Sequence, residues 1–116
     1  MEIDYGMAGL VVSDRDSAAG WYARLLGRQA DMLPNDAEAT WRLTDSSSLY
    51  LLADHSRAGK GVLTLMVADL DAELALIANR GVEPGPVKDV GTAGRKSVIT
   101  DPDGNQVSIV QLSTQA

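Results

Sequence analysis

The sequence predicts an α+β fold built from two tandem modules, each with the order strand, helix and three strands. Residues 9–16 begin as an apolar strand and lead into a helical stretch that ends at Gly27. Residues 65–71 lead in the same way into a second helical stretch that ends at Gly81. Each stretch is followed by further short apolar segments separated by turn residues, which is typical of strands.

The two leading segments match at a constant offset, and self-similarity at a fixed period indicates a structural repeat. The matching residues of the first segment and the second are Val12, Asp14 and Asp16 against Val67, Asp69 and Asp71. We therefore expect one domain over residues 1–116, with a first module over about residues 1–54 and a second over about 61–113. The segment between them, 55–60, is polar and lacks periodicity, so we expect a linker there.

Apolar residues recur in both helical stretches at the spacing of a buried helix face. In the first stretch we expect Ser13 to cap the helix and Gly27 to end it; the apolar face consists of Ala18, Trp21, Tyr22, Leu25 and Leu26. In the second we expect Asp69 as the cap; the apolar face consists of Leu70, Leu74 and Ile77. Packing in the core accounts for both faces.

The sequence Asp101-Pro102-Asp103-Gly104-Asn105 lies between two apolar runs and predicts a tight hairpin. Proline presets a negative φ, aspartate accepts local backbone hydrogen bonds, and glycine adopts a positive φ. The other strands are expected near residues 29–33, 39–43, 48–52, 85–89, 95–100 and 106–111.

Composition narrows the possible partners. The net charge is −6 and the pI is near 4.5, so phosphate backbones and anionic lipids are repelled, and neither nucleic acid nor a membrane is an expected partner. The chain has no cysteine, which excludes disulfides and thiolate metal sites. Its start lacks the pattern of a signal peptide, and we expect a cytoplasmic protein. The single histidine, His55, lies in the linker and is expected to be solvated.

Three segments together resemble the glyoxalase, bleomycin-resistance and extradiol-dioxygenase superfamily, the vicinal oxygen chelate fold. They are the Ser13-Asp14 helix start followed by Trp21-Tyr22 and Leu25-Leu26-Gly27, the residues 67–71, and the hairpin at residues 101–105. The resemblance implies paired βαβββ modules whose curved mixed sheet surrounds a cleft, with the helices outside. It also implies a homodimer, in some members with modules exchanged between chains.

The superfamily's enzymes hold a divalent metal in the cleft through His, Gln or Glu on the first strand of each module and Glu on the last strand. The resemblance places these positions at Met7 and Val62, at Ser108, and near Tyr50 or Leu52. None of these side chains is a usual ligand for a hard divalent cation. We therefore expect no metal and no cofactor.

Strand alternation, applied to the implied cleft, gives a largely apolar lining with a few hydroxyls. The expected lining residues are Met7, Val11, Trp41, Tyr50, Leu52, Val62, Thr64, Met66 and Ser108. Such a surface is typical of a small-molecule site; the alternative is that these residues fill the space between modules or form a dimer interface. Arg95 and Lys96 are candidates to orient an anionic ligand group, with one of the two expected to point to solvent.

The resulting hypothesis is a metal-independent protein that binds a hydrophobic, aromatic or cationic small molecule, with sequestration of that molecule as its role. The alternative is a metal-dependent lyase, isomerase or dioxygenase of the same superfamily with an atypical site. A regulatory module that acts by contact with another protein is a third option. No catalytic residue can be assigned from the sequence, because no arrangement of nucleophile and base is present.

Overall fold

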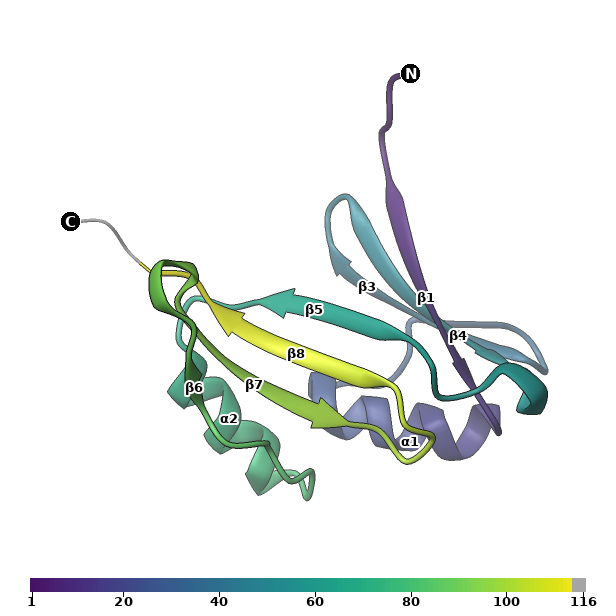
Figure 1. Cartoon of the computed structure of the whole chain (residues 1–116). Coiled ribbons are helices and arrows are strands. Elements are labelled where there is room, and N and C mark those ends of the chain that lie inside the picture. The colour runs from purple at the N-terminus through teal and green to yellow at the C-terminus, as the bar shows by residue number, and fades with distance from the viewer. Residues whose placement is uncertain (114–116) are drawn as a thin grey trace.

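The computed structural model describes residues 1–113 and contains two four-stranded sheets, each covered on one face by a helix (Figure 1). The first module consists of β1 (Gly6–Val12), α1 (Arg15–Leu26), β2 (Met32–Asn35), β3 (Glu38–Thr44) and β4 (Ser47–Ala53). The second consists of β5 (Val62–Met66), α2 (Leu70–Asn79), β6 (Lys88–Asp89), β7 (Arg95–Thr100) and β8 (Gln106–Gln111). Two 3₁₀ turns, η1 (His55–Arg57) and η2 (Gly91–Ala93), lie in connecting segments.

The two sheets have the same topology, which confirms the predicted tandem βαβββ modules and the α+β class. Their strand orders are β1-β4-β3-β2 and β5-β8-β7-β6. The first strand of each module runs parallel to the last, whereas the other neighbours are antiparallel. Within residues 1–113, no helix is long and apolar enough to cross a membrane.

The helices form where the apolar spacing predicts them, with one correction at the start of α1. Asp14, rather than Ser13, is the N-cap, because its carboxylate accepts the backbone N–H of Ser17 at 2.8 Å. Gly27 ends α1 with a φ of +84°, as expected for the residue after a helix. Asp69 caps α2 as predicted.

One hydrophobic core runs beneath both sheets on the helix side. The helical residues predicted to be buried are buried, including Trp21, Tyr22, Leu70 and Ile77; Leu26 is partly buried. They share one cluster with the helix-facing residues of the sheets, which include Leu10, Val12, Leu49, Leu51, Leu63, Val107 and Ile109. Figure 1 shows α1 and α2 on the same side of the two sheets.

The turn between β7 and β8 joins the second module to the first. Asp101 is buried, and its Oδ1 accepts the backbone N–H groups of Asp103, Gly104 and Asn105, each at 2.9 Å. Its Oδ2 accepts the hydroxyl of Tyr22 on α1 and the side-chain amide of Asn105, both at 2.8 Å. We call Tyr22, Asp101 and Asn105 the inter-module clamp.

Asn105 extends the clamp to the first strand and to the linker. Its amide nitrogen also donates to the carbonyl of Val11 at 2.9 Å, and its oxygen accepts the backbone N–H of Gly61 at 2.8 Å. Asp103 adds an exposed contact, because its carboxylate accepts the backbone N–H of Ser13 at 3.0 Å. The turn therefore holds β1, α1 and the start of β5 in fixed relative positions.

A second link lies at the far ends of the helices. Arg80, the C-cap of α2, donates to the carbonyl of Arg24 and, at 2.8 Å, to that of Leu25. These carbonyls belong to the last turn of α1, where a positive charge interacts favourably with the negative end of the helix dipole. The two helices are thereby joined at their C-terminal ends.

The linker contains more regular structure than its sequence pattern predicts. Asp54 caps η1 by accepting the backbone N–H of Ser56 and forms an ion pair with Arg57 at 2.7 Å. A three-residue 3₁₀ turn has no apolar face, so periodicity cannot reveal it.

Replacing Tyr22 by phenylalanine should weaken the clamp and change the response to alkaline pH. Burial, together with the hydrogen bond to Asp101, raises the pKa of Tyr22 well above its ordinary value of 10.0. Because the folded-state pKa is the higher one, the stability linked to this hydroxyl is fully present below pH 10 and is lost as the pH rises. We expect Tyr22→Phe to lower the free energy of unfolding by about 1 to 2 kcal/mol at pH 7.

Between about pH 9.5 and 11 the free energy of unfolding should fall less steeply in Tyr22→Phe than in the wild type. Urea unfolding at a series of pH values, at one protein concentration, measures both effects. Tyr50→Phe, which removes a hydroxyl outside the clamp, is the matched control, because any change of slope that it shares with Tyr22→Phe does not come from the clamp. Parallel slopes for all three proteins would contradict the assigned role of Tyr22.

Candidate functional site

Each sheet has one face turned away from the helices, which we call its open face. On β1 the buried residues Leu10 and Val12 point to the helix side, so Met7, Gly9 and Val11 point to the open face. Laterally paired residues share a face. The open face of the first sheet therefore also includes Ser48, Tyr50 and Leu52 from β4 and Glu38, Thr40 and Arg42 from β3.

The open face of the second sheet follows from the same reasoning. Leu63 on β5 is buried, whereas Val62 and Met66 are 69% and 68% exposed. The register then places Val62, Thr64 and Met66 from β5 beside Gln106, Ser108 and Val110 from β8. It adds Lys96, Val98 and Thr100 from β7, and Lys88 from β6.

The nine residues predicted to line a cleft lie on these two open faces, with one exception. Trp41 is paired with Leu49, and both are fully buried on the helix side. Its indole nitrogen donates to the carbonyl of Arg28 at 2.9 Å, and its ring centroid lies 6.3 Å from that of Tyr22. The prediction that Trp41 lines the cleft is wrong, because this residue lies on the opposite face of β3. Its neighbours Thr40 and Arg42 are polar, and this alternation indicates that Trp41 points to the helix side.

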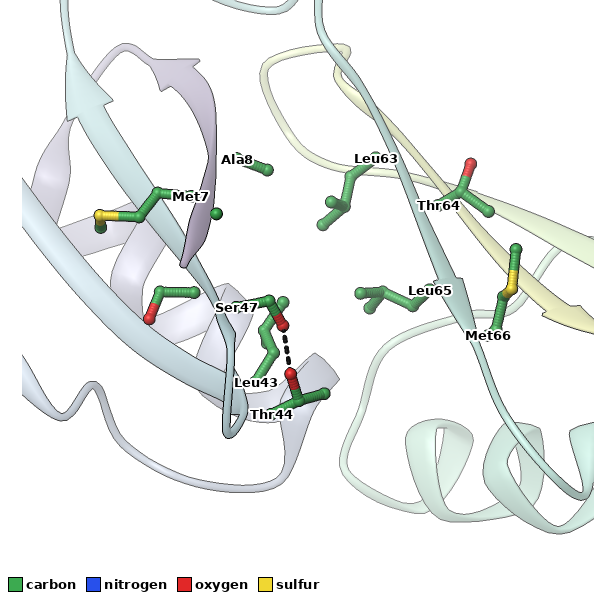
Figure 2. Close-up of a pocket in the computed structure, with 11 residues that line it drawn as sticks. Met7, Ala8, Leu43, Thr44, Ser47, Leu63, Thr64, Leu65 and Met66 are labelled. Atoms are coloured by element: carbon green, nitrogen blue, oxygen red, sulfur yellow. Dashed lines mark hydrogen bonds between the residues drawn. The ribbon is translucent and has the colours of Figure 1, made fainter. Parts of the chain in front are cut away.

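A cavity of about 600 Å³ lies between the facing edges of β1 and β5 (Figure 2). Its lining residues are Gly6, Met7, Ala8, Leu43, Thr44, Ser47, Ser48, Leu63, Thr64, Leu65 and Met66. Of the predicted residues, only Met7, Thr64 and Met66 belong to it. Figure 2 shows Leu63 and Leu65 pointing from β5 toward β1, whereas Met7 points to the opposite side of β1. The cavity is therefore apolar, with hydroxyls such as those of Thr44 and Ser47, 2.6 Å apart, on one side.

Two tyrosines add aromatic surface to the open face of the first sheet. A Cβ atom at Gly9 would lie 2.4 Å from Cζ of Tyr50, so the ring of Tyr50 lies directly over the glycine. The hydroxyl of Tyr5, a residue that is 41% exposed, bonds to Oγ of the buried Ser48. Ser48 and Tyr5 are missing from the predicted lining, because only the tertiary structure brings their hydroxyl groups together.

The positions expected for metal ligands do not suit a divalent cation. Met7 offers a thioether, Val62 has no donor atom, and Ser108 and Tyr50 offer only hydroxyl groups. Within residues 1–113, no group of three or more His, Cys, Asp or Glu side chains could hold a metal ion. His55 is exposed in η1.

The two cationic candidates at the start of β7 point to opposite faces of the sheet. Arg95 lies on the helix side and forms two hydrogen bonds with the carboxylate of Asp71, at 2.9 and 3.2 Å. This contact holds the pKa of Asp71 below its ordinary value. Lys96 lies on the open face, where its cross-strand neighbour is Lys88.

A family model and a similar solved structure place this chain in the same protein family. A family model described as a glyoxalase-like domain matches residues 7–110. A glyoxalase/bleomycin resistance protein from Catenulispora acidiphila has 33% sequence identity and a TM-score of 0.88, and the alignment covers 97% of this chain and 100% of that one. No curated protein matches in sequence.

Two further similar structures carry names that describe a ligand. The antibiotic-binding protein TnmS3 from a Streptomyces species has 25% identity and a TM-score of 0.74, with 97% of each chain covered. A bleomycin-binding protein from Streptomyces verticillus, solved with copper(II)-bleomycin, has 21% identity and a TM-score of 0.79, with 97% of this chain and 99% of that one covered. At 21% identity, the similarity to the bleomycin-binding protein shows a shared fold and nothing more.

Adding a methyl group at Gly9 should move the ring of Tyr50 without disturbing the rest of the strand. The atoms that a Cβ would meet belong to a half-buried side chain, so we expect Gly9→Ala to displace the ring and cost about 1 kcal/mol or less. The ring-proton chemical shifts of Tyr50 report the displacement. Gly6→Ala, on the same strand with nothing within 4 Å of the added atom, should leave them unchanged. Equal shifts in both variants would contradict the contact.

Proposed function

Since this chain belongs to the glyoxalase-like domain family, we propose that it is a small-molecule-binding protein of the glyoxalase and bleomycin-resistance type that works without a metal ion. The chemistry of the open faces carries this proposal. Where the superfamily's enzymes are expected to hold metal ligands, this chain has Met7, Val62 and Ser108. Apolar surface with a few hydroxyls is suited to holding a ligand, and the positions expected for metal ligands carry no carboxylate or imidazole.

The ligand we propose has a hydrophobic or aromatic body. Met7, Met66 and Tyr50 supply flexible thioether and flat aromatic surfaces, which adapt to planar ligands. The name of the similar antibiotic-binding protein TnmS3 supports sequestration of such a compound as a role. The chain has no cysteine that would require an oxidising compartment, and we place its action in the cytoplasm.

We also propose that two copies pair through their open faces. Met7, Met32, Val62 and Met66 are between 54% and 69% exposed, an unusual concentration of large apolar side chains on the surface. The radius of gyration is 14.5 Å, whereas about 13 Å is expected for a compact chain of this length. An open face of one copy placed against an open face of the other would cover these residues and enclose a ligand between them.

Saturable binding in the absence of metal tests the function. We expect equilibrium dialysis against a panel of neutral, cationic and anionic planar aromatic compounds to give at least one ligand with a dissociation constant in the micromolar range or tighter. Treatment with EDTA should leave its affinity unchanged, and metal analysis should find well under one metal ion per chain. A stoichiometric tightly bound metal, or activity that appears on addition of nickel, zinc, iron or manganese, would favour the lyase, isomerase or dioxygenase alternative.

Light scattering after size-exclusion chromatography tests the pairing. The wild type should have twice the chain mass of 12.3 kDa at micromolar concentration. Met66→Glu should shift the equilibrium toward the monomer, because it buries a charge in the interface. Leu76→Glu is the matched control, since Leu76 is 51% exposed on α2, away from the open faces. A monomeric wild type, or equal loss of dimer in both variants, would contradict the proposal.

A further inference from the structure

Two lysines lie side by side on the open face of the second sheet. The register pairs Lys88 on β6 with Lys96 on β7, and Lys96 with Val110 on β8. Val110 is paired in turn with Met66 on β5. One row across the four strands therefore contains two apolar residues followed by two ammonium groups, all on the same face.

This arrangement is unfavourable for the protein alone. Like charges placed directly opposite each other on neighbouring strands destabilise the pair. The sequence has 16 acidic residues against 10 basic ones, so carboxylates are plentiful. Yet within residues 1–113 neither Lys88 nor Lys96 forms an ion pair.

The adjacent arginine shows that the nearby carboxylates lie on the other side of the sheet. Arg95 is bonded to Asp71, and the charges of Asp89 and Asp69 also act on it. Asp89 is paired with Arg95 in the register, so it lies on the helix side as well. Acidic groups thus lie near Arg95 on one face, whereas no carboxylate within residues 1–113 pairs with either lysine on the other.

The neighbouring rows of the open face supply the rest of a binding surface. Met66 is 68% exposed and Val110 is half-buried, so both are available to an apolar body. Two residues further along the strands, about 7 Å away, Thr64 and Ser108 lie next to each other and offer hydroxyl groups.

We propose that Lys88 and Lys96 form an anion-binding subsite and that the ligand is an amphiphilic anion. Its apolar or aromatic body lies on Met66 and Val110, and its carboxylate, sulfonate or phosphate group lies between the two ammonium groups. The inference rests on the proposed function, whose site it deepens by naming the charge of the ligand. The net charge of −6 favours cations at long range, but salt screens that field within about 10 Å, and the charges in contact with the ligand are positive.

Two fluorescent probes that differ by one charged group test the proposal. 8-Anilinonaphthalene-1-sulfonate carries a sulfonate, and N-phenyl-1-naphthylamine has the same aromatic body without it. We expect the wild type to bind the sulfonate probe more tightly than the neutral probe at low ionic strength. Lys88→Gln and Lys96→Gln should each weaken the sulfonate probe about three-fold, and the double variant about ten-fold. The neutral probe should change less than two-fold.

Lys60→Gln is the matched control, because it removes the same charge from the linker. It should leave both affinities at wild-type values. Sodium chloride at high concentration should weaken the sulfonate probe in the wild type and have little effect in the double variant.

The outcomes separate the inference from the function on which it rests. If the neutral probe binds saturably but the double variant binds the sulfonate probe as tightly as the wild type, the anion subsite is wrong and the binding function stands. Equal weakening of both probes would overturn the subsite in the same way. If neither probe binds the wild type, the proposed function and the subsite both fail.

Discussion

The buried carboxylate of Asp101 is the group on which the arrangement of the two modules depends. A charge that is only 4% exposed is costly unless it is fully hydrogen-bonded, and Asp101 accepts five hydrogen bonds. Three of them form the turn itself, and the one from Tyr22 reaches into the other module. Asn105, bound to the same carboxylate, also holds β1 through Val11. The edges of β1 and β5, and the cavity between them, are therefore held in place by hydrogen bonds that centre on this carboxylate and on Asn105.

The open faces follow from this arrangement. Both helices cover the same side of the sheets, where they contribute to a single core. The opposite side keeps exposed methionines, valine and tyrosine, which no segment within residues 1–113 covers. The charges are divided in the same way: Arg95 has its carboxylate partner on the helix side, while Lys96, the next residue, points to the open face. The open faces, which the helices do not cover, are thus the faces on which we propose that the ligand binds.

Local patterns predicted the elements well where one physical signal dominates. Asp69 and Gly27 mark helix ends because caps need particular residue types, and the predicted ranges of β7 and β8 agree with the structure. The signals fail where two interpretations differ by one residue. Ser13 and Asp14 are both good caps, and Trp41 suits either face of its strand until the pairing with Leu49 is known. The position of Lys88 beside Lys96 could not be predicted, because β6 has only two residues and its partner depends on the register with β7.

Four features can be predicted from the amino-acid sequence: the repeated module, the apolar faces of the helices, the hairpin at residues 101–105 and the poor fit of Met7, Val62 and Ser108 to a metal. These depend on residue identity and short spacing, which a single chain displays directly. The folded chain was needed to establish which residues share a face, since lateral pairing joins positions more than forty residues apart, as with Gly9 and Tyr50. It also decided that Tyr22 meets Asp101 and that Lys88 meets Lys96. Such contacts arise from sheet register and module packing, neither of which local composition encodes.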